Sequence, residues 1–139
     1  MTETTTHQDP APRLRDHPVD RGIGASQTLD LGAALDHLLA EDHPAIHGHR
    51  QVTLFHQVPV TLVLFAFDAG GELPDHVAQG MVTIQALDGA LTVQAGGADH
   101  PLTAGQILVL TPAVAHSVRA ARASTMLLTV HQVAPAEVE

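Results

Sequence analysis

The chain has 139 residues and a formal net charge of −9, because 15 acidic residues face six Arg and no Lys. This charge repels nucleic-acid phosphates and anionic lipid surfaces, so neither is an expected partner. The absence of Cys excludes disulfides, thiolate metal sites and cysteine nucleophiles. The length suits one domain, and any metal site must use His, carboxylate or amide ligands.

The first 25 residues are rich in Thr, Asp, Pro and His and have no hydrophobic period. This composition predicts a mobile arm over residues 1–25, followed by a single domain over residues 26–139. The arm lacks the basic start and apolar run of a signal peptide, and no apolar run reaches the length of a bilayer span. We therefore expect a cytoplasmic protein with no membrane contact.

An amphipathic helix is predicted directly after the arm, in the stretch SQTLDLGAALDHLLAED. Its apolar residues recur at helical spacing, behind a Ser or Thr cap, and His43-Pro44 is expected to end it. These residues are Leu31, Ala34, Leu35, Leu38 and Leu39.

From Gln51 onward, short β-branched and Leu-rich runs alternate with Gly, Pro and Asp, as in an all-β domain. The predicted strands are residues 52–57, 60–67, 81–87, 90–95, 106–110, 116–119 and 125–132. The stretches DAGGELP and AGGADHPLTAG between them are interpreted as turns. A meander of this kind closes most easily as a sandwich or small barrel, here over about residues 51–133.

The stretch LFAFDAGGELPDHVAQGMVTIQALDGALTVQAGGADHPLTAGQILVLTPAVAHSV resembles the cupin superfamily. The resemblance rests on the order of strands, Gly turns and two histidines. It implies an all-β, cupin-type jelly-roll β-barrel with one N-terminal helix. It also implies a homodimer, for which the arm and the first strands are plausible contact material, and a lumen suited to a small, largely apolar ligand.

The first cupin motif, Gly-x5-His-x-His-x3 or x4-Glu-x6-Gly, is only partly present. Anchoring its end on Gly89 places Val82 at the glutamate position, and anchoring its second histidine on His76 places Pro74 at the first. Two of its three ligand positions are then apolar.

The second motif, Gly-x5-Pro-x-Gly-x2-His-x3-Asn, is matched at its first residue and its histidine by Gly105 and His116. Thr111 stands at the Pro position, Ala113 at the Gly position and Ala120 at the Asn position. Of the metal ligands that the resemblance implies, His76 and His116 remain.

Two histidines are fewer than the three or four protein ligands of a stable site. Gln85, His56 and Gln79 are the candidates for a further ligand, although strand alternation turns Gln85 away from the face of Val82. Alternatively, His76 and His116 are hydrogen-bonded lumen residues with no metal. His43, His47 and His49, in HPAIHGHR, imitate a His-x-His motif but are interpreted as a solvated loop.

Two functions follow from the resemblance. The first is a small-molecule or divalent-metal-binding module with His76 and His116 facing the lumen. The second is a metal-dependent enzyme of the dioxygenase or isomerase type that uses the same two ligands. The sequence names no catalytic residue and does not distinguish Zn, Mn, Fe or Ni, and none of its three Ser lies in a Gly-x-Ser-x-Gly elbow.

Overall fold

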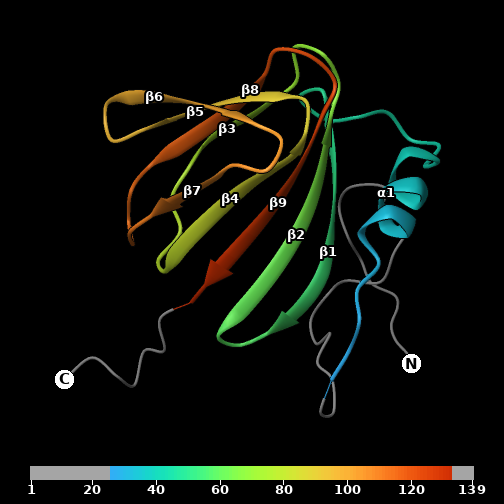
Figure 1. The fold of residues 1–139 in the computed structure, drawn as a ribbon, viewed down its shortest axis with the longest axis horizontal. Helices are drawn as coiled ribbons and strands as arrows, with labels where there is room; N and C mark the ends of the chain where they lie inside the picture. The colour runs from blue at the N-terminus through green and yellow to red at the C-terminus, as the bar shows by residue number, and fades with distance from the viewer. Residues whose placement is uncertain (1–25, 133–139) are drawn as a thin grey trace.

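A computed structural model of the chain describes residues 26–132, so the arm predicted over residues 1–25 lies outside the described residues. One helix packs beside two β-sheets (Figure 1). The elements are α1 (Leu31–Leu39), β1 (His49–Gln57), β2 (Val60–Phe67), β3 (Glu72–His76), β4 (Met81–Asp88), β5 (Ala90–Ala95), β6 (Ala98–Thr103), β7 (Ile107–Leu110), β8 (His116–Ala120) and β9 (Ser124–His131).

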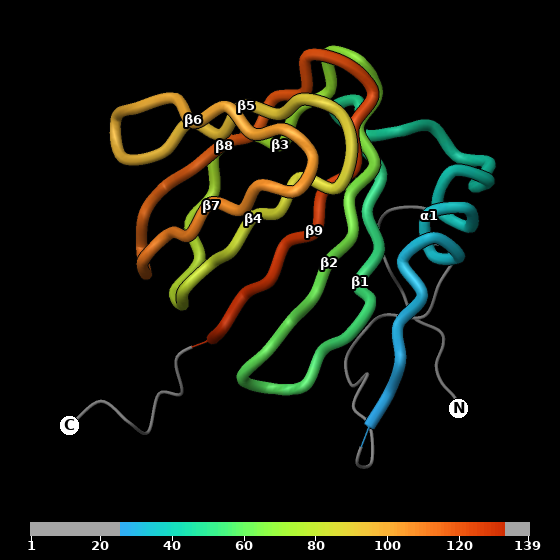
Figure 2. Tube along the Cα trace, in the orientation of Figure 1, coloured from blue at the N-terminus to red at the C-terminus, as the bar shows by residue number. Residues whose placement is uncertain are grey.

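The two sheets are antiparallel and exchange strands along the chain. The five-stranded sheet has the order β1-β2-β9-β4-β7, and the four-stranded sheet has the order β3-β8-β5-β6. Figure 2 shows the last strand, β9, running between β2 and β4. The chain crosses from one sheet to the other after β2, β3, β4, β6, β7 and β8, and the predicted all-β, jelly-roll-like architecture is confirmed.

Strands β3 and β6 lie in stretches that the sequence had led us to interpret as turns, and that interpretation was wrong. Both are edge strands of the four-stranded sheet. Each contains a proline, Pro74 in β3 and Pro101 in β6, together with charged or polar residues. Edge strands tolerate Pro and charge because one side of the backbone makes no ladder, so they lack the hydrophobic pattern of central strands.

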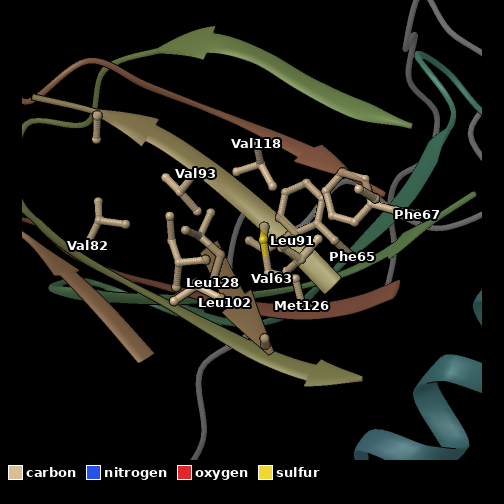
Figure 3. Close-up of a cluster of buried hydrophobic side chains, with 14 of the residues drawn as sticks. Val63, Phe65, Phe67, Val82, Leu91, Val93, Leu102, Val118, Met126 and Leu128 are labelled. Atoms are coloured by element: carbon tan, nitrogen blue, oxygen red, sulfur yellow. The ribbon is translucent and has the colours of Figure 1, made fainter. Parts of the chain in front are cut away.

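The interior between the sheets is filled by one apolar cluster that draws on both of them. Phe65 and Phe67 lie at one end of this cluster and Val82 lies at the other (Figure 3). Leu, Val, Ile and Ala supply most of the remainder, as expected for a chain with no Trp or Tyr. Side chains at alternate positions of β4 and β8 point into this cluster.

Helix α1 packs on β1 and β2 through a buried Leu38. Its N-cap is Asp30, whose carboxylate accepts the backbone N–H of Ala33 at 2.9 Å. The predicted Ser or Thr cap was therefore wrong, and the carboxylate satisfies one of the free N–H groups of the first turn. Within the described range, no helix combines the length and apolar character that a membrane span requires.

Ile84 lies at the centre of the core and is 0 % exposed. Ile84→Ala is expected to lower the free energy of unfolding by about 2–5 kcal/mol, because it removes buried methylene groups and leaves a cavity. Urea denaturation followed by circular dichroism measures the loss. The matched control is Ile46→Ala, at a side chain that is 58 % exposed, and an equal loss there would contradict the assignment of the core.

Candidate histidine site

The pairing of β3 with β8 brings the two predicted site residues together. His76 and His116 are directly opposite one another in the ladder. Their ring centroids are 4.2 Å apart, with an angle of 62° between the ring planes. Residues 40 positions apart in the sequence thus form one pair of imidazoles.

A β-bulge in β3 determines which way His76 points. The register runs from Leu73 opposite Val118 to His76 opposite His116, so three steps along β3 match two along β8. Leu73 packs against the core, and strict alternation would turn the third residue after it outward. The extra residue restores the inward direction. Pro74 is compatible with the bulge because the ladder needs no N–H there.

Backbone carbonyls determine which nitrogen of each ring carries the hydrogen. The Nδ1 of His76 lies 3.3 Å from the carbonyl oxygen of Pro74, and the Nδ1 of His116 lies 3.1 Å from that of Val114. A carbonyl oxygen can only accept, so each Nδ1 is the donor and each neutral ring has its lone pair on Nε2. The Nε2 of His116 is buried and has no hydrogen-bond partner among residues 26–132. A buried lone pair without a partner is available to a ligand.

Burial lowers the pKa of His116 below its usual value of 6.5. The bond to the Val114 carbonyl raises this pKa, the neighbouring His76 lowers it, and the Asp75 carboxylate raises it, but burial is the largest effect. Desolvation disfavours the imidazolium, so the neutral ring is the stable form at neutral pH.

Acid is expected to destabilise the fold partly through His116. Its folded-state pKa is lowered, so the unfolded chain binds the proton more readily. The stability that His116 contributes is therefore complete above about pH 6.5 and is lost as the pH falls through the lowered value. Urea denaturation from pH 8 to pH 5 should show a shallower loss for His116→Gln than for the wild type. His131→Gln, at an exposed histidine, is the control and should lose stability as steeply as the wild type. An equally steep loss for His116→Gln would contradict the prediction.

The turn before His116 has a left-handed backbone at Ala113, where φ is 69°. The second cupin motif has Gly at this position, so the turn keeps the glycine conformation although the residue is Ala. The N–H of Ala113 donates to the carbonyl of Ala78 at 3.0 Å, which ties this turn to the loop after His76. The strain is maintained at the point where both histidine-bearing loops meet.

Replacing Ala113 by Gly is expected to stabilise the protein by about 0.5–1 kcal/mol. The change removes the clash of Cβ in the left-handed region, which exceeds the entropic cost of glycine. Thermal and urea denaturation measure the difference. Ala115→Gly, two residues away and outside the left-handed region, is the control and should destabilise. Destabilisation by Ala113→Gly would show that the turn gains nothing from glycine.

The structure changes the alignment of the first motif. Pro74, placed at its first histidine by the sequence reading, is exposed on the bulge, whereas Ala78 packs against the core. Counting from Gly70 places His76 at the first histidine, Ala78 at the second and Val82 at the glutamate, with every interval kept to Gly89. The two missing ligand positions are therefore Ala78 and Val82, and both are apolar.

Of the three candidates for a further ligand, Gln85 faces away from the core and His56 is held elsewhere. Gln85 alternates with buried Ile84 and Ala86 and so faces away from the core, as the strand pattern predicted. His56 lies across from Thr61 and bonds its hydroxyl at 2.7 Å. Gln79 is exposed in the loop after His76. Within residues 26–132, no three His, Cys, Asp or Glu side chains are arranged to hold a metal ion.

The prediction of a solvated loop for His49 was wrong. His49 is the first residue of β1 and is buried. Its ring lies 5.4 Å and 5.5 Å from the rings of Phe65 and Phe67, and its Nδ1 is 2.9 Å from the carbonyl oxygen of Glu72. His49 therefore links β1 to the start of β3. The link joins residues far apart in the sequence, so no local pattern indicated it.

Cations in the described part of the chain lie away from the histidine pair. Arg119 is near the end of β8, Arg122 is in the following turn and Arg50 is near the start of β1. Strand β8 begins at His116 and runs away from the histidine pair, so Arg119 and Arg122 lie toward its other end. The start of β1, with Arg50, lies beside the start of β3 at that same end of the barrel, which holds His49. The histidine end has Asp75 as its nearest charged neighbour in sequence.

No protein-family model and no curated protein matches the sequence. Solved structures do match the fold. A cupin superfamily protein from Desulfitobacterium hafniense has a TM-score of 0.62 at 16 % identity, over 88 % of this chain and 94 % of that one. An RmlC-like cupin from Desulfovibrio desulfuricans has a TM-score of 0.58 at 28 % identity, over 68 % and 92 %.

A third structure, salicylate 1,2-dioxygenase from Pseudaminobacter salicylatoxidans, has a TM-score of 0.62 at 21 % identity. The match covers 73 % of this chain and 32 % of the dioxygenase chain. Together with the strand order and the two histidine-bearing turns, these likenesses show that the chain has the cupin fold.

Proposed function

We propose that the chain is a cupin module that binds a divalent metal ion or a small molecule through His76 and His116. The observation that carries the proposal is the arrangement of the two rings. They come from neighbouring strands, each Nδ1 is held by a backbone carbonyl, and the Nε2 of His116 is buried without a partner. Histidines that ligate metals commonly donate the other ring N–H in this way.

The residues present fit a divalent transition ion as two ligands of a site. Neutral imidazole is a good ligand for Zn, Ni, Cu and Fe, and burial keeps His116 neutral. Ala78 and Val82, at the other two ligand positions, offer no donor atom in their side chains. Solvent or a bound molecule would supply the remaining donors. A metal held there would act as a Lewis acid toward that molecule.

The surroundings favour a neutral ligand over an anion. The Arg residues of the described part lie at the other end of the barrel, and Asp75 adjoins His76. A carboxylate or phosphate at the pair would find no fixed cation from the described residues to compensate its lost hydration. Apolar contacts from Ala78 and Val114, both packed against the core, suit a small and largely apolar molecule.

The alternative is a metal-dependent enzyme of the dioxygenase or isomerase type. Its support is the likeness in fold to the salicylate dioxygenase. An enzyme would need a firmly held ion, which ordinarily has three protein ligands. The binding module needs only the two imidazoles that the geometry already brings together, so we favour it.

Metal binding by the pair is tested by titrating untagged protein with Zn²⁺ or Ni²⁺ in a calorimeter. One ion per chain is expected. His76→Ala and His116→Ala should each weaken binding at least about tenfold, since loss of a ligand costs no less than loss of the group that orients it. Mass spectrometry of the metal content of purified protein gives an independent measurement.

The chain has eleven His, so matched controls are essential. His131→Ala removes an exposed histidine, and His56→Ala removes a histidine that bonds Thr61, so both variants should retain binding. Equal weakening by His131→Ala would show that the ions bind dispersed surface histidines. No binding by the folded wild type would remove the metal and leave the small-molecule proposal.

A further inference from the structure

The outer face of the five-stranded sheet carries an apolar patch on β4, β7 and β9. Ile107 and Val109 of β7 are each 54 % exposed, and Met81 of β4 is 43 % exposed. Gln85 lies between Ile107 and Leu127, and Thr83 lies between Val109 and Thr129. These outward side chains form one continuous surface, which we call the β7 face. It is separate from the histidine pair, which belongs to the interior side of the other sheet.

The β7 face bears no formal charge. This part of the sheet includes no Asp, Glu, Lys or Arg. It consists of residues 81–85, 107–110 and 127–129. The chain as a whole has a net charge of −9. The carboxylates in the described range lie elsewhere: near the helix, at Asp68 in the turn after β2, on β3, at Asp88 where β4 ends, and at Asp99 in β6.

This distribution of charge selects the kind of partner. A basic partner would be attracted to the carboxylate-bearing surfaces and would gain nothing from the β7 face. A second copy of this acidic chain would be repelled by those same surfaces. It can approach without burying a carboxylate only where the surface is neutral, and two identical neutral faces complement each other across a two-fold axis.

Strand β7 gives a second reason for the face to be covered. Its sequence is ILVL, and it is an edge strand paired with β4 alone among the described residues. Exposed edge strands are normally protected by Lys or another charged residue, or by Pro, and β7 contains none of these. An uncovered edge of this composition is an aggregation hazard, and a partner over the β7 face would shield it.

We propose that the β7 face is the homodimer interface of this protein, with β4, β7 and β9 of one copy meeting the same strands of the other. The contact then lies at the β7 edge of the five-stranded sheet, opposite β1. The sequence had instead suggested the arm and the first strands as the contact. The proposal does not depend on any function of the histidine pair.

Sedimentation velocity and light scattering on the full chain test the proposal. The wild type should be a dimer at micromolar concentration. Val109→Glu and Ile107→Glu each place two carboxylates in the interface of a dimer, and each should weaken dimerisation on the order of 100-fold or more, giving monomers. Leu39→Glu adds the same charge at a residue that is 59 % exposed on the helix, and it should remain dimeric.

The absence of Cys permits a second test that does not add charge. Single cysteines at Met81, Ile107 and Val109 are oxidised, and at least one should give a covalent dimer, because residues near a two-fold axis meet their own copies. Leu39→Cys is the control. A monomeric wild type, an intact dimer in folded Val109→Glu and Ile107→Glu, or crosslinking at Leu39 alone would overturn the proposal.

Discussion

The alternation of side chains between the two faces of a strand decides where the histidines of this molecule point. Strand β8 keeps strict alternation and places His116 inward together with Val118 and Ala120. Strand β3 reaches the same side only because one extra residue at Pro74 and Asp75 shifts its phase. The pairing of the two rings therefore depends on that single shift. The inward direction of His76 is thus set by the backbone register of β3.

The surroundings of the histidine pair have two opposite effects on its capacity to bind a metal. Ala78 and Val82 remove donor atoms, which weakens any hold on a metal. The burial of His116, in contrast, keeps that imidazole neutral at neutral pH. Neutral imidazole is the form that binds a metal or accepts a hydrogen bond from a ligand. The pair therefore offers few donor atoms to a metal, but the His116 imidazole is in the neutral form that binds one.

The sequence predicted the central strands, the helix and the position of His116, because each is encoded locally. Hydrophobic runs bounded by Gly and Pro mark these strands in the sequence. It did not predict β3 and β6, whose Pro and polar residues are allowed only because they lie at sheet edges. It also missed the burial of His49, whose contacts with Phe65 and Phe67 depend on the pairing of β1 with β2. Register and long-range pairing are properties of the assembled sheets, so no local pattern reports them.

The two histidines differ in the freedom of the strands that carry them. Strand β8 lies between β3 and β5 and is bonded on both sides, whereas β3 is an edge strand with an interrupted ladder. Edge segments with few cross-strand bonds open locally at lower free energy than central ones. His116 is therefore a fixed reference point, and His76 is the partner that can adjust its distance. An ion or molecule bound as proposed above would be matched in radius by movement of the His76 ring only.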